Sequence, residues 1–261
     1  MTRRRFYAPP SAFSADRQSV RLASDEARHL RDVLRLQRGD EVHVFDGEGK
    51  EFQCTIEDSS REFARLKIVA EVQPARPESP LDLTLAVALL KGEKFDLVVQ
   101  KATELGVTRI LPVITERADV RLRDSGDGAK RVARWQRIAL EAAKQSGRAR
   151  VPEIAPPIAF KSLTEPSTAE NAESFAPGNT FGLMFAERDG HSLVEDIKHL
   201  PARPRKITAL VGSEGGWTDE EIAEARKAEW KIVTLSGRTL RAETAAISVA
   251  ALLQHLFGDL L

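Results

Sequence analysis

The fold is decided by Leu210-Val211-Gly212-Ser213-Glu214-Gly215-Gly216, where a short apolar strand runs into a glycine-rich loop. Trp217 closes this loop, and Thr218-Asp219-Glu220-Glu221 begins a helix. A second loop of the same kind reads Leu235-Ser236-Gly237-Arg238-Thr239-Leu240-Arg241-Ala242-Glu243-Thr244 and runs into Ala245-Ala246-Ile247. Glycine lets a backbone approach a ligand closely, and open α/β sheets bind ligands outside the carboxyl ends of their strands. The two loops therefore predict one pocket whose walls are mostly backbone.

Strand and helix signals alternate through the part of the chain that holds these loops. Apolar runs predict strands at Leu83–Leu90, Val107–Ile114, Phe181–Ala186, Ile207–Val211 and Lys231–Leu235. Helices are expected at about Phe95–Leu105, Lys130–Ser146 and Glu243–Phe257, while Ile154–Thr180 has the composition of a loop. This alternation predicts a mostly parallel sheet with helices on both faces.

The first part of the chain is instead rich in short alternating strands. They are expected at Glu41–Phe45, Phe52–Ile56 and Phe63–Val69, with Gly/Asp turn chemistry after the first, which predicts a small barrel or sandwich. Before them, Ser24 is expected to cap a short helix whose apolar face is formed by Ala27, Leu30, Val33 and Leu34. A proline-rich linker at 74–80 then divides the chain, so we expect two domains, residues 1–73 and residues 81–261.

The composition is that of a soluble globular protein without a global charge bias. Lys+Arg and Asp+Glu number 39 each, which argues against binding to nucleic acid by net charge but leaves local basic patches open. No apolar run approaches the length that spans a bilayer, and no apolar segment follows the basic start. We therefore expect a cytoplasmic protein with no membrane contact.

Several kinds of chemistry are excluded by what the sequence lacks. The single cysteine, Cys54, rules out an internal disulfide, and its alternating setting predicts a buried core residue. The five histidines show no metal-ligand spacing, so no metal is expected. A Gly-x-Ser-x-Gly nucleophile elbow is absent. Hydrolase and metalloenzyme functions are therefore disfavoured.

The two loops differ in what they predict. The first lacks the lysine and spacing of a phosphate-binding loop, and Glu214 would repel a phosphate, so a neutral or cationic ligand fits better. It is equally well explained as a tight turn followed by a capping box of Thr218 and Glu221. In the second loop, Glu243 suits the first turn of a helix, whereas Arg241 is unfavourable at a helix N-terminus unless it has another partner.

Two further features of the sequence bear on whether the protein binds nucleic acid or a second subunit. Basic residues concentrate in residues 3–38, with nine arginines against four acids, and in residues 109–150, with eleven Lys/Arg against five acids. Such runs are usually solvated faces, yet two patches on a neutral chain are also what a nucleic-acid footprint would leave. The last helix is apolar almost all round, which core burial and a subunit interface explain equally well.

These residues resemble a known family, the SPOUT-class methyltransferases that methylate N3 of a uridine in 16S ribosomal RNA (the RsmE family). The resemblance covers nearly the whole chain. It rests on both C-terminal loops and on His29-Leu30-Arg31-Asp32-Val33-Leu34-Arg35, Gly39-Asp40, Phe45-Asp46-Gly47, Lys91-Gly92, Gln100-Lys101-Ala102-Thr103-Glu104-Leu105-Gly106-Val107, Trp135-Gln136-Arg137-Ile138 and Glu141-Ala142-Ala143-Lys144-Gln145-Ser146-Gly147-Arg148. One departure is Ser213, where the family usually has proline.

The resemblance implies an N-terminal PUA-like β-barrel and a C-terminal SPOUT α/β domain with a trefoil knot, working as a homodimer with the last helix at the interface. It implies S-adenosylmethionine as cofactor, and 16S rRNA or the small ribosomal subunit as partner. The residues expected to line the cofactor pocket are Leu183, Leu210, Gly212, Glu214, Gly215, Leu235, Gly237 and Leu240.

Catalytic and RNA-binding residues follow from the same resemblance and from the charge pattern. Arg241 is expected to stabilise negative charge on the uridine once N3 loses its proton. Glu243 is a candidate for the proton acceptor, although its place at a helix terminus explains it as well. The expected phosphate contacts are Arg3, Arg4, Arg5, Arg31, Arg35, Arg117, Arg121 and Arg148.

Two alternatives remain at this stage. One is a non-catalytic RNA-binding assembly factor that keeps the fold, against which the intact second loop speaks. The other is methylation at a different atom or of a different RNA, because the residues themselves do not name the uridine.

Overall fold

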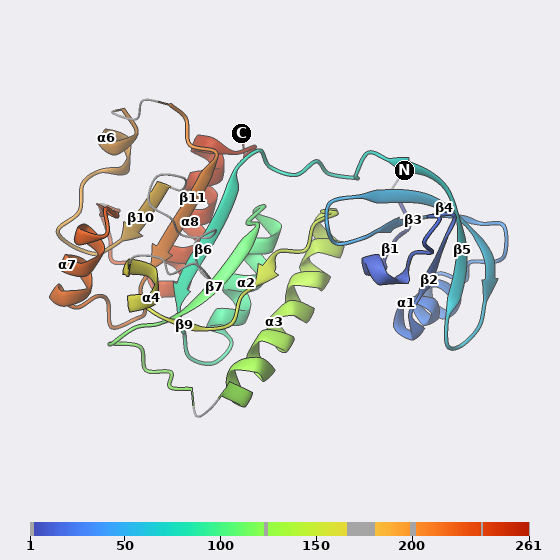
Figure 1. Ribbon diagram of the computed structural model, residues 1–261, viewed down its shortest axis with the longest axis horizontal. Helices are drawn as coiled ribbons and strands as arrows, with labels where there is room; N and C mark the ends of the chain where they lie inside the picture. The colour runs from blue at the N-terminus through green and yellow to red at the C-terminus, as the bar shows by residue number, and fades with distance from the viewer. Residues whose placement is uncertain (1–2, 123–124, 166–180, 199–201, 236, 261) are drawn as a thin grey trace. The chain divides into compact units, whose positions relative to one another are not determined.

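The computed structural model describes residues 3–122, 125–165, 181–198, 202–235 and 237–260. The chain divides into two compact units. The N-terminal unit comprises Met1–Glu78 together with Leu140–Val151, and the C-terminal unit comprises Ser79–Ala139 with Pro152–Leu261. Both are drawn in Figure 1.

The N-terminal unit is built on a five-stranded sheet of order β1-β3-β4-β5-β2. The three strands expected from the sequence are present, and two shorter strands flank them at the sheet edges. Only β1 and β3 pair in parallel; the other neighbours are antiparallel. The strand bounds are β1 Arg5–Tyr7, β2 Ser19–Leu22, β3 Glu41–Phe45, β4 Glu51–Ser59 and β5 Ala64–Val72.

The core of this unit is formed by the inward-facing residues of all five strands. Alternation places every second side chain on the same face, and the buried set includes Phe6, Val20, Leu22, Val42, Val44, Phe52, Cys54, Ile56 and Leu66. The prediction that Cys54 is a core residue is therefore confirmed.

The expected short helix differs from the observed one in its cap and its apolar face. Helix α1 spans Ser24–Arg28, so Ser24 is its first residue, and the capping position belongs to Ala23, which has no capping side chain. The chain then continues as a π-helical turn over His29–Val33, in which the Leu34 N–H donates to the His29 carbonyl. Because this turn is wider than an α-helical one, Leu30 stays buried but Val33 is 64% exposed and Leu34 39% exposed. The expectation for these last two residues was wrong.

A buried carboxylate ties the start of the chain to the sheet. Glu51, the first residue of β4, is fully buried. Its oxygens accept from Arg3 Nη1 at 3.0 Å, from Arg5 Nη2 at 3.0 Å and from the Ala75 N–H at 3.0 Å. Burial by itself would raise the pKa of Glu51, but the Ala75 N–H and the two guanidinium groups lower it by more. The Glu51 carboxylate is therefore ionised. Arg3 and Arg5, from the start of the chain, balance its charge, and the Ala75 N–H donates a further hydrogen bond to it.

We predict that Glu51→Ala destabilises the protein by about 3 kcal/mol, because it leaves two cations without their buried partner. The matched control is Glu71→Ala, which removes an ion pair with Lys50 whose side chains are both about half exposed; it should cost less than about 1 kcal/mol. Urea denaturation checks both. Since the native pKa of Glu51 is lowered, its contribution is present at neutral pH and is lost as the pH falls through that native pKa. Equal effects of the two substitutions would contradict the assigned role of Glu51.

Cys54 gives a chemical test of the same core. Burial raises the pKa of its thiol to about 12, and the thiolate is the reactive form. We predict that the folded protein does not react with a thiol reagent at pH 8, whereas the protein unfolded in urea reacts at one site. Stoichiometric labelling of the folded protein would show that this core opens.

The C-terminal unit contains a parallel sheet, as the alternation of strands and helices predicted. It has seven strands, the five expected ones and two further strands of two residues each, β8 and β9. The strand order is β12-β10-β11-β6-β7-β8, and β9 also pairs with β7. The strand bounds are β6 Asp82–Ala88, β7 Arg109–Ile114, β8 Glu153–Ile154, β9 Ile158–Ala159, β10 Phe181–Phe185, β11 Lys206–Val211 and β12 Lys231–Val233.

Helices cover both faces of this sheet. On one face α4 and α7 share a core with the strands through Leu163, Ile222 and Trp230. Helices α2 and α8 pack on each other, α8 contacts β6 and β11, and Figure 1 shows the pair on the far side of the sheet. The helix bounds are α2 Lys94–Glu104, α3 Ser125–Ser146, α4 Lys161–Thr164, α6 Leu193–Lys198, α7 Asp219–Lys227 and α8 Ala242–Phe257. Within the stretch expected to be loop, β9 and α4 are present, and residues 166–180 lie outside the described residues.

The end of α2 illustrates why a glycine is required there. Gly106 has φ +81°, and a Cβ added to it would lie 2.9 Å from Nε2 of Gln254 in α8. The same buried glutamine accepts from Ser79 Oγ at 2.7 Å. Gly106, just after the end of α2, therefore also allows α2 and α8 to pack closely.

Candidate active site

Both glycine-bearing loops open into one cavity, as the sequence predicted. Its volume is about 540 Å³, and it lies where adjacent strands β12, β10 and β11 end. The N-terminal turn of α8 completes the wall. The lining residues are Phe185, Ala186, Glu187, Val211, Gly212, Ser213, Glu214, Gly215, Gly216, Trp217, Thr234, Leu235, Gly237, Arg238, Thr239, Leu240, Arg241, Ala242 and Ala245.

The first loop is held by an indole ring at its centre. Trp217 is almost fully buried, and its Nε1 donates to the Phe185 carbonyl at 2.9 Å, which ties the end of β11 to the end of β10. A Cβ on Gly212 would lie 3.0 Å from this ring. A Cβ on Gly215 would lie 2.8 Å from the Arg117 carbonyl oxygen. These glycines are thus required by close packing of the loop.

The helix that follows begins with the expected capping box. Thr218 Oγ1 accepts from the Glu221 N–H at 3.1 Å, and Glu221 Oε2 accepts from the Thr218 N–H at 3.0 Å. The other oxygen of Glu221 accepts from the Glu116 N–H at 3.0 Å. The capping box therefore also anchors the loop that follows β7.

The second loop brings a cation to the cavity. Gly237 has φ +112°, and a Cβ added there would meet no atom within 4 Å. Arg241 occupies the N-cap position of α8 in extended conformation and lines the cavity. Its side chain is exposed and has no ion pair or hydrogen bond within the described part of the chain. A cation at a helix N-terminus is unfavourable without a partner, and a bound ligand would supply that partner to Arg241.

An ion pair links the cavity to helix α2. Lys94 Nζ lies 2.7 Å from Glu214 Oε1. Burial raises the pKa of Glu214, but the hydrogen bond and charge of Lys94, together with a backbone hydrogen bond, outweigh burial, so that the pKa is lowered. The bond to Glu214 raises the pKa of Lys94, and the charge of Glu243 adds to this effect. Glu214 therefore faces the cavity as a carboxylate, beside a second one from Glu187.

Glu243 lies in a different place from that expected of a proton acceptor. It is in the first turn of α8, is 9% exposed and is not among the residues that line the cavity. Its Oε2 is buried and has no hydrogen-bond partner in the described residues. This position suits an anion that stabilises the positive end of the helix.

Most of the expected pocket residues are brought together. Gly212, Glu214, Gly215, Leu235, Gly237 and Leu240 line the cavity. Leu183 and Leu210 do not, because they lie within β10 and β11, are fully buried, and leave the strand ends to Phe185 and Val211. Ser236 lies outside the described residues.

Sequence reasoning missed two charged residues of the site. Glu187 follows β10, whose exit carries no glycine until Gly190, so nothing in the pattern marked it. Lys94 is the first residue of a helix and reads as an ordinary surface lysine. Both reach the cavity region through the parallel order of the sheet, which brings distant strand ends to one edge.

The arginines expected to bind RNA fall into two groups. Arg5 and Arg148 are inside the N-terminal unit, 8% and 5% exposed, and pair with Glu51 and Glu78. This favours a structural role for both over the expected phosphate contact, because their guanidinium groups are themselves buried and already paired, Arg5 with the buried Glu51 and Arg148 with the partly buried Glu78. Arg3 also pairs with Glu51 but is more exposed.

The remaining five arginines are more accessible. Arg4 and Arg35 are exposed, and Arg31 forms an ion pair with the neighbouring Asp32 at 2.6 Å. Arg121 donates to the Glu116 carbonyl at 3.2 Å, and Arg117 Nη1 lies 3.4 Å from the Gly215 carbonyl oxygen. The Arg117 bond puts one of the expected RNA-binding residues directly beside the cavity loop.

Two further findings bear on the kind of site. Among the described residues, no group of three or more His, Cys, Asp and Glu side chains could hold a metal ion. No helix within the same residues is both long enough and apolar enough to cross a membrane.

Comparison with known proteins identifies both parts of the chain. Residues 77–254 match the family of the RNA methyltransferase domain, and residues 22–69 match the RNA methyltransferase PUA domain. A ribosomal RNA small subunit methyltransferase E from Synechocystis is 34% identical over 87% of this chain and 70% of its own length. One from Rickettsia conorii is 31% identical over 91% and 90%.

Solved structures agree with this assignment. A ribosomal RNA small subunit methyltransferase E from Neisseria gonorrhoeae, bound to S-adenosyl methionine, matches with a TM-score of 0.83 and 34% identity over 100% of both chains. A methyltransferase from Legionella pneumophila in complex with the same cofactor matches with a TM-score of 0.82 and 30% identity, over 99% of this chain and 100% of its own. With a PUA domain before an RNA methyltransferase domain and these relatives over most of its length, the chain belongs to the family of the ribosomal RNA small subunit methyltransferases E.

Proposed function

We propose that this protein is an S-adenosylmethionine-dependent methyltransferase that acts on N3 of a uridine in 16S rRNA, in the cytoplasm. The observation that carries the proposal is the single cavity formed by both loops, with Arg241 at its wall and no partner for that side chain within the described residues. Family membership and the cofactor-bound relative from Neisseria gonorrhoeae support the substrate and the cofactor.

The cavity fits this cofactor in size and in chemistry. Its volume of about 540 Å³ is within the range of small-molecule sites. Ser213 Oγ is buried there and has no hydrogen-bond partner in the described residues, so a polar ligand atom would satisfy it. The carboxylates of Glu187 and Glu214 suit a ligand with cationic groups. The bound cofactor supplies an activated methyl group.

The residues of the chain then have two tasks, to orient the ligands and to stabilise charge. Uridine N3 carries a proton in its neutral form, and its loss leaves negative charge on the base oxygens. Arg241, as an exposed and unpaired cation at the cavity wall, stabilises that charge. The target base must leave its helical stack to reach the site.

Glu243 does not carry the proton in this proposal. Its carboxylate is buried in the first turn of α8 and does not line the cavity. Its charge acts on Lys94 and on the helix N-terminus. We assign Glu243 the role of holding the start of α8, and therefore Arg241, in position.

The proposal also includes a trefoil knot and a homodimer. Support for the knot comes from the strand order, because the chain leaves β11, adds β12 on the far side of β10, and returns so that α8 packs against β6 and β11.

Support for the dimer comes from the neighbouring α2 and α8. Leu97 is 40% exposed, and Ile247, Ala251 and Leu252 are only partly buried.

Contact with the RNA backbone is assigned to the accessible arginines. These are Arg4, Arg31 and Arg35 of the N-terminal unit and Arg117 and Arg121 of the C-terminal unit, with a smaller share for Arg3. Phosphate contacts of this kind orient an RNA without reading its sequence.

We predict that Arg241→Ala lowers kcat about 10²- to 10³-fold, as loss of one charge-stabilising donor does, while the Kd for S-adenosylmethionine changes less than about threefold. Arg241→Lys keeps the charge and should retain intermediate activity. Methyl transfer to 16S rRNA and calorimetric titration of the cofactor measure the two quantities. If cofactor affinity falls in parallel with kcat, Arg241 is a cofactor ligand and the proposed role is wrong.

We predict that Gly237→Val abolishes cofactor binding, because the new side chain enters the cavity wall and φ +112° is strained for valine. The matched control is Gly49→Val, since Gly49 has φ +111° and equally open surroundings but lies in the N-terminal unit. It should cost similar stability and leave binding intact. Calorimetric titration checks both. Wild-type protein that binds the cofactor but methylates no rRNA or ribosomal subunit would instead support a non-catalytic assembly factor.

A further inference from the structure

A second cavity, here called the α3 cavity, lies between the start of α2 and the first half of α3. Its volume is about 290 Å³, and it shares no lining residue with the cofactor cavity. All of its lining residues belong to the C-terminal unit: Gly92, Phe95, Asp96, Asp127, Lys130, Arg131, Arg134 and Trp135. None of them has a role in the function proposed above.

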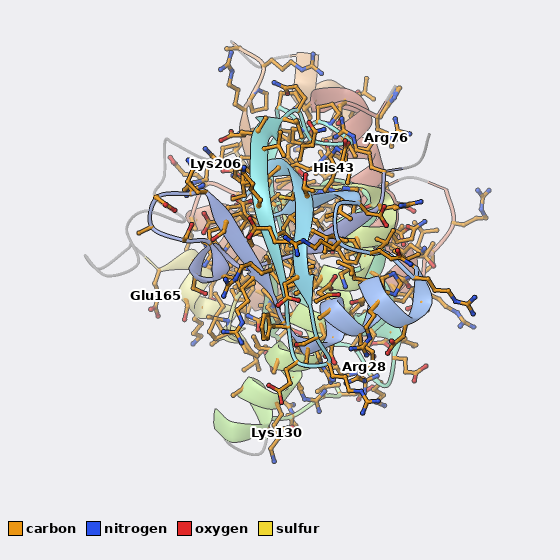
Figure 2. The ribbon with its side chains drawn as sticks, turned by 90° about the vertical axis from the view of Figure 1, so that its right-hand side faces the viewer. Arg28, His43, Arg76, Lys130, Glu165 and Lys206 are labelled. Carbon is orange, nitrogen blue, oxygen red and sulfur yellow. The ribbon has the colours of Figure 1, made fainter. Side chains whose placement is uncertain are left out.

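Three cationic residues from neighbouring turns of α3, Lys130, Arg131 and Arg134, are among the residues that line this cavity. Lys130 is exposed and has no ion pair in the described part of the chain, and Figure 2 shows its side chain extending away from the helix. Arg131 Nε is 3.5 Å from Asp127 Oδ1, and Arg134 pairs with Asp96. Most N–H groups of the two guanidinium groups remain available to a ligand, since each guanidinium carries five.

The two carboxylates of the cavity are engaged by protein groups. Asp96 Oδ1 accepts from Trp135 Nε1 at 3.0 Å, and its Oδ2 pairs with Arg134. Trp135 in turn packs on Phe95 with ring centroids 4.3 Å apart, which makes a rigid apolar floor. The cavity is lined by three cationic and two anionic side chains, so the net charge of its lining is positive. Gly92 at the rim has φ +59° and no atom within 4 Å of an added Cβ, so the rim is open.

The α3 cavity is joined to the cofactor cavity through the start of α2. Gly92 is two residues from Lys94, whose ammonium group bonds to Glu214 of the cofactor cavity at 2.7 Å. Lys91 pairs with Asp119 at 2.7 Å, in the same loop as Arg117 and Arg121. Cationic residues thus occur in both loops that follow β6 and β7, at the carboxyl edge of the sheet.

We propose that the α3 cavity binds a backbone phosphate of the RNA that flanks the target nucleotide, an inference that rests on the proposed function. An extruded base rotates about its own backbone, and contacts to the phosphates beside it hold the strand in register. A phosphate is small enough for about 290 Å³, and its oxygens accept from several N–H donors at once. Three cationic side chains of one helix, beside the apolar surface of Phe95 and Trp135, suit a compact anion such as phosphate.

The test compares the double variant Lys130→Ala/Arg131→Ala with wild type. Arg134 is left in place because it supports Asp96 and Trp135. Binding of 16S rRNA transcribed in vitro is measured from 50 to 200 mM salt. We expect the Kd at 50 mM to rise roughly five- to tenfold, and the slope of log K against log salt to fall by about 0.7 for each phosphate that the variant no longer binds. The Kd for S-adenosylmethionine should be unchanged, because the two cavities share no lining residue.

Two controls make the result specific. Lys227→Ala/Lys231→Ala removes two exposed lysines of the same unit, at the end of α7 and the start of β12, and should leave both the Kd and the slope unchanged. Lys130→Arg/Arg131→Lys keeps both charges and should retain wild-type affinity within about twofold.

The outcomes separate this inference from the function on which it rests. If wild type neither binds nor methylates the RNA, the proposed function fails. If wild type is active and the double alanine variant has the wild-type Kd and salt slope, the inference alone fails. Weakened binding to assembled small subunits with unchanged binding to free rRNA also overturns it, because a ribosomal protein would then be the ligand of the α3 cavity.

Discussion

The parallel pairing of strands in the C-terminal sheet is the constraint on which the site depends. Because all of its strand pairs are parallel, every carboxyl end lies at one edge of the sheet. The order β12-β10-β11 then makes neighbours of segments that are far apart along the chain. The bond from Trp217 Nε1 to the Phe185 carbonyl fixes two of these ends together. This arrangement of strand ends positions the loops that form the cavity, and with them Glu187, Glu214 and Arg241.

The sequence predicted those features that a local pattern controls. Five of the seven strands of the parallel sheet, the capping box of Thr218 and Glu221, the buried Cys54 and the common pocket of the two loops all follow from apolar periodicity or turn chemistry. Strands β8 and β9, of two residues each, were not foreseen. The short strands β1 and β2 were not foreseen, since three or four residues carry too little alternation to distinguish them from loop. The π-helical turn that exposes Val33 and Leu34 is set by packing, and no residue signal marks it.

Within the site, the sequence was least informative about which atoms face the cavity. The family resemblance supplied Leu183 and Leu210, which are interior strand residues, whereas the last residues of those strands form the wall. Glu187 and Lys94 enter through tertiary contacts alone. Arg5 and Arg148 are a further example, because the sequence does not distinguish an arginine that faces solvent from one that pairs with a carboxylate inside the fold.

The composition of the N-terminal unit has a consequence for the order of events during synthesis. The unit includes Leu140–Val151, and Arg5 donates to the Arg148 carbonyl at 3.0 Å within it. A ribosome that has made residue 78 must add 73 more residues before this segment exists, which takes roughly 4 to 15 seconds at ordinary elongation rates. During that interval the β-sheet of the unit lacks part of its own packing. The N-terminal unit is therefore completed only after Ser79–Ala139, the first segment of the C-terminal unit, has been translated.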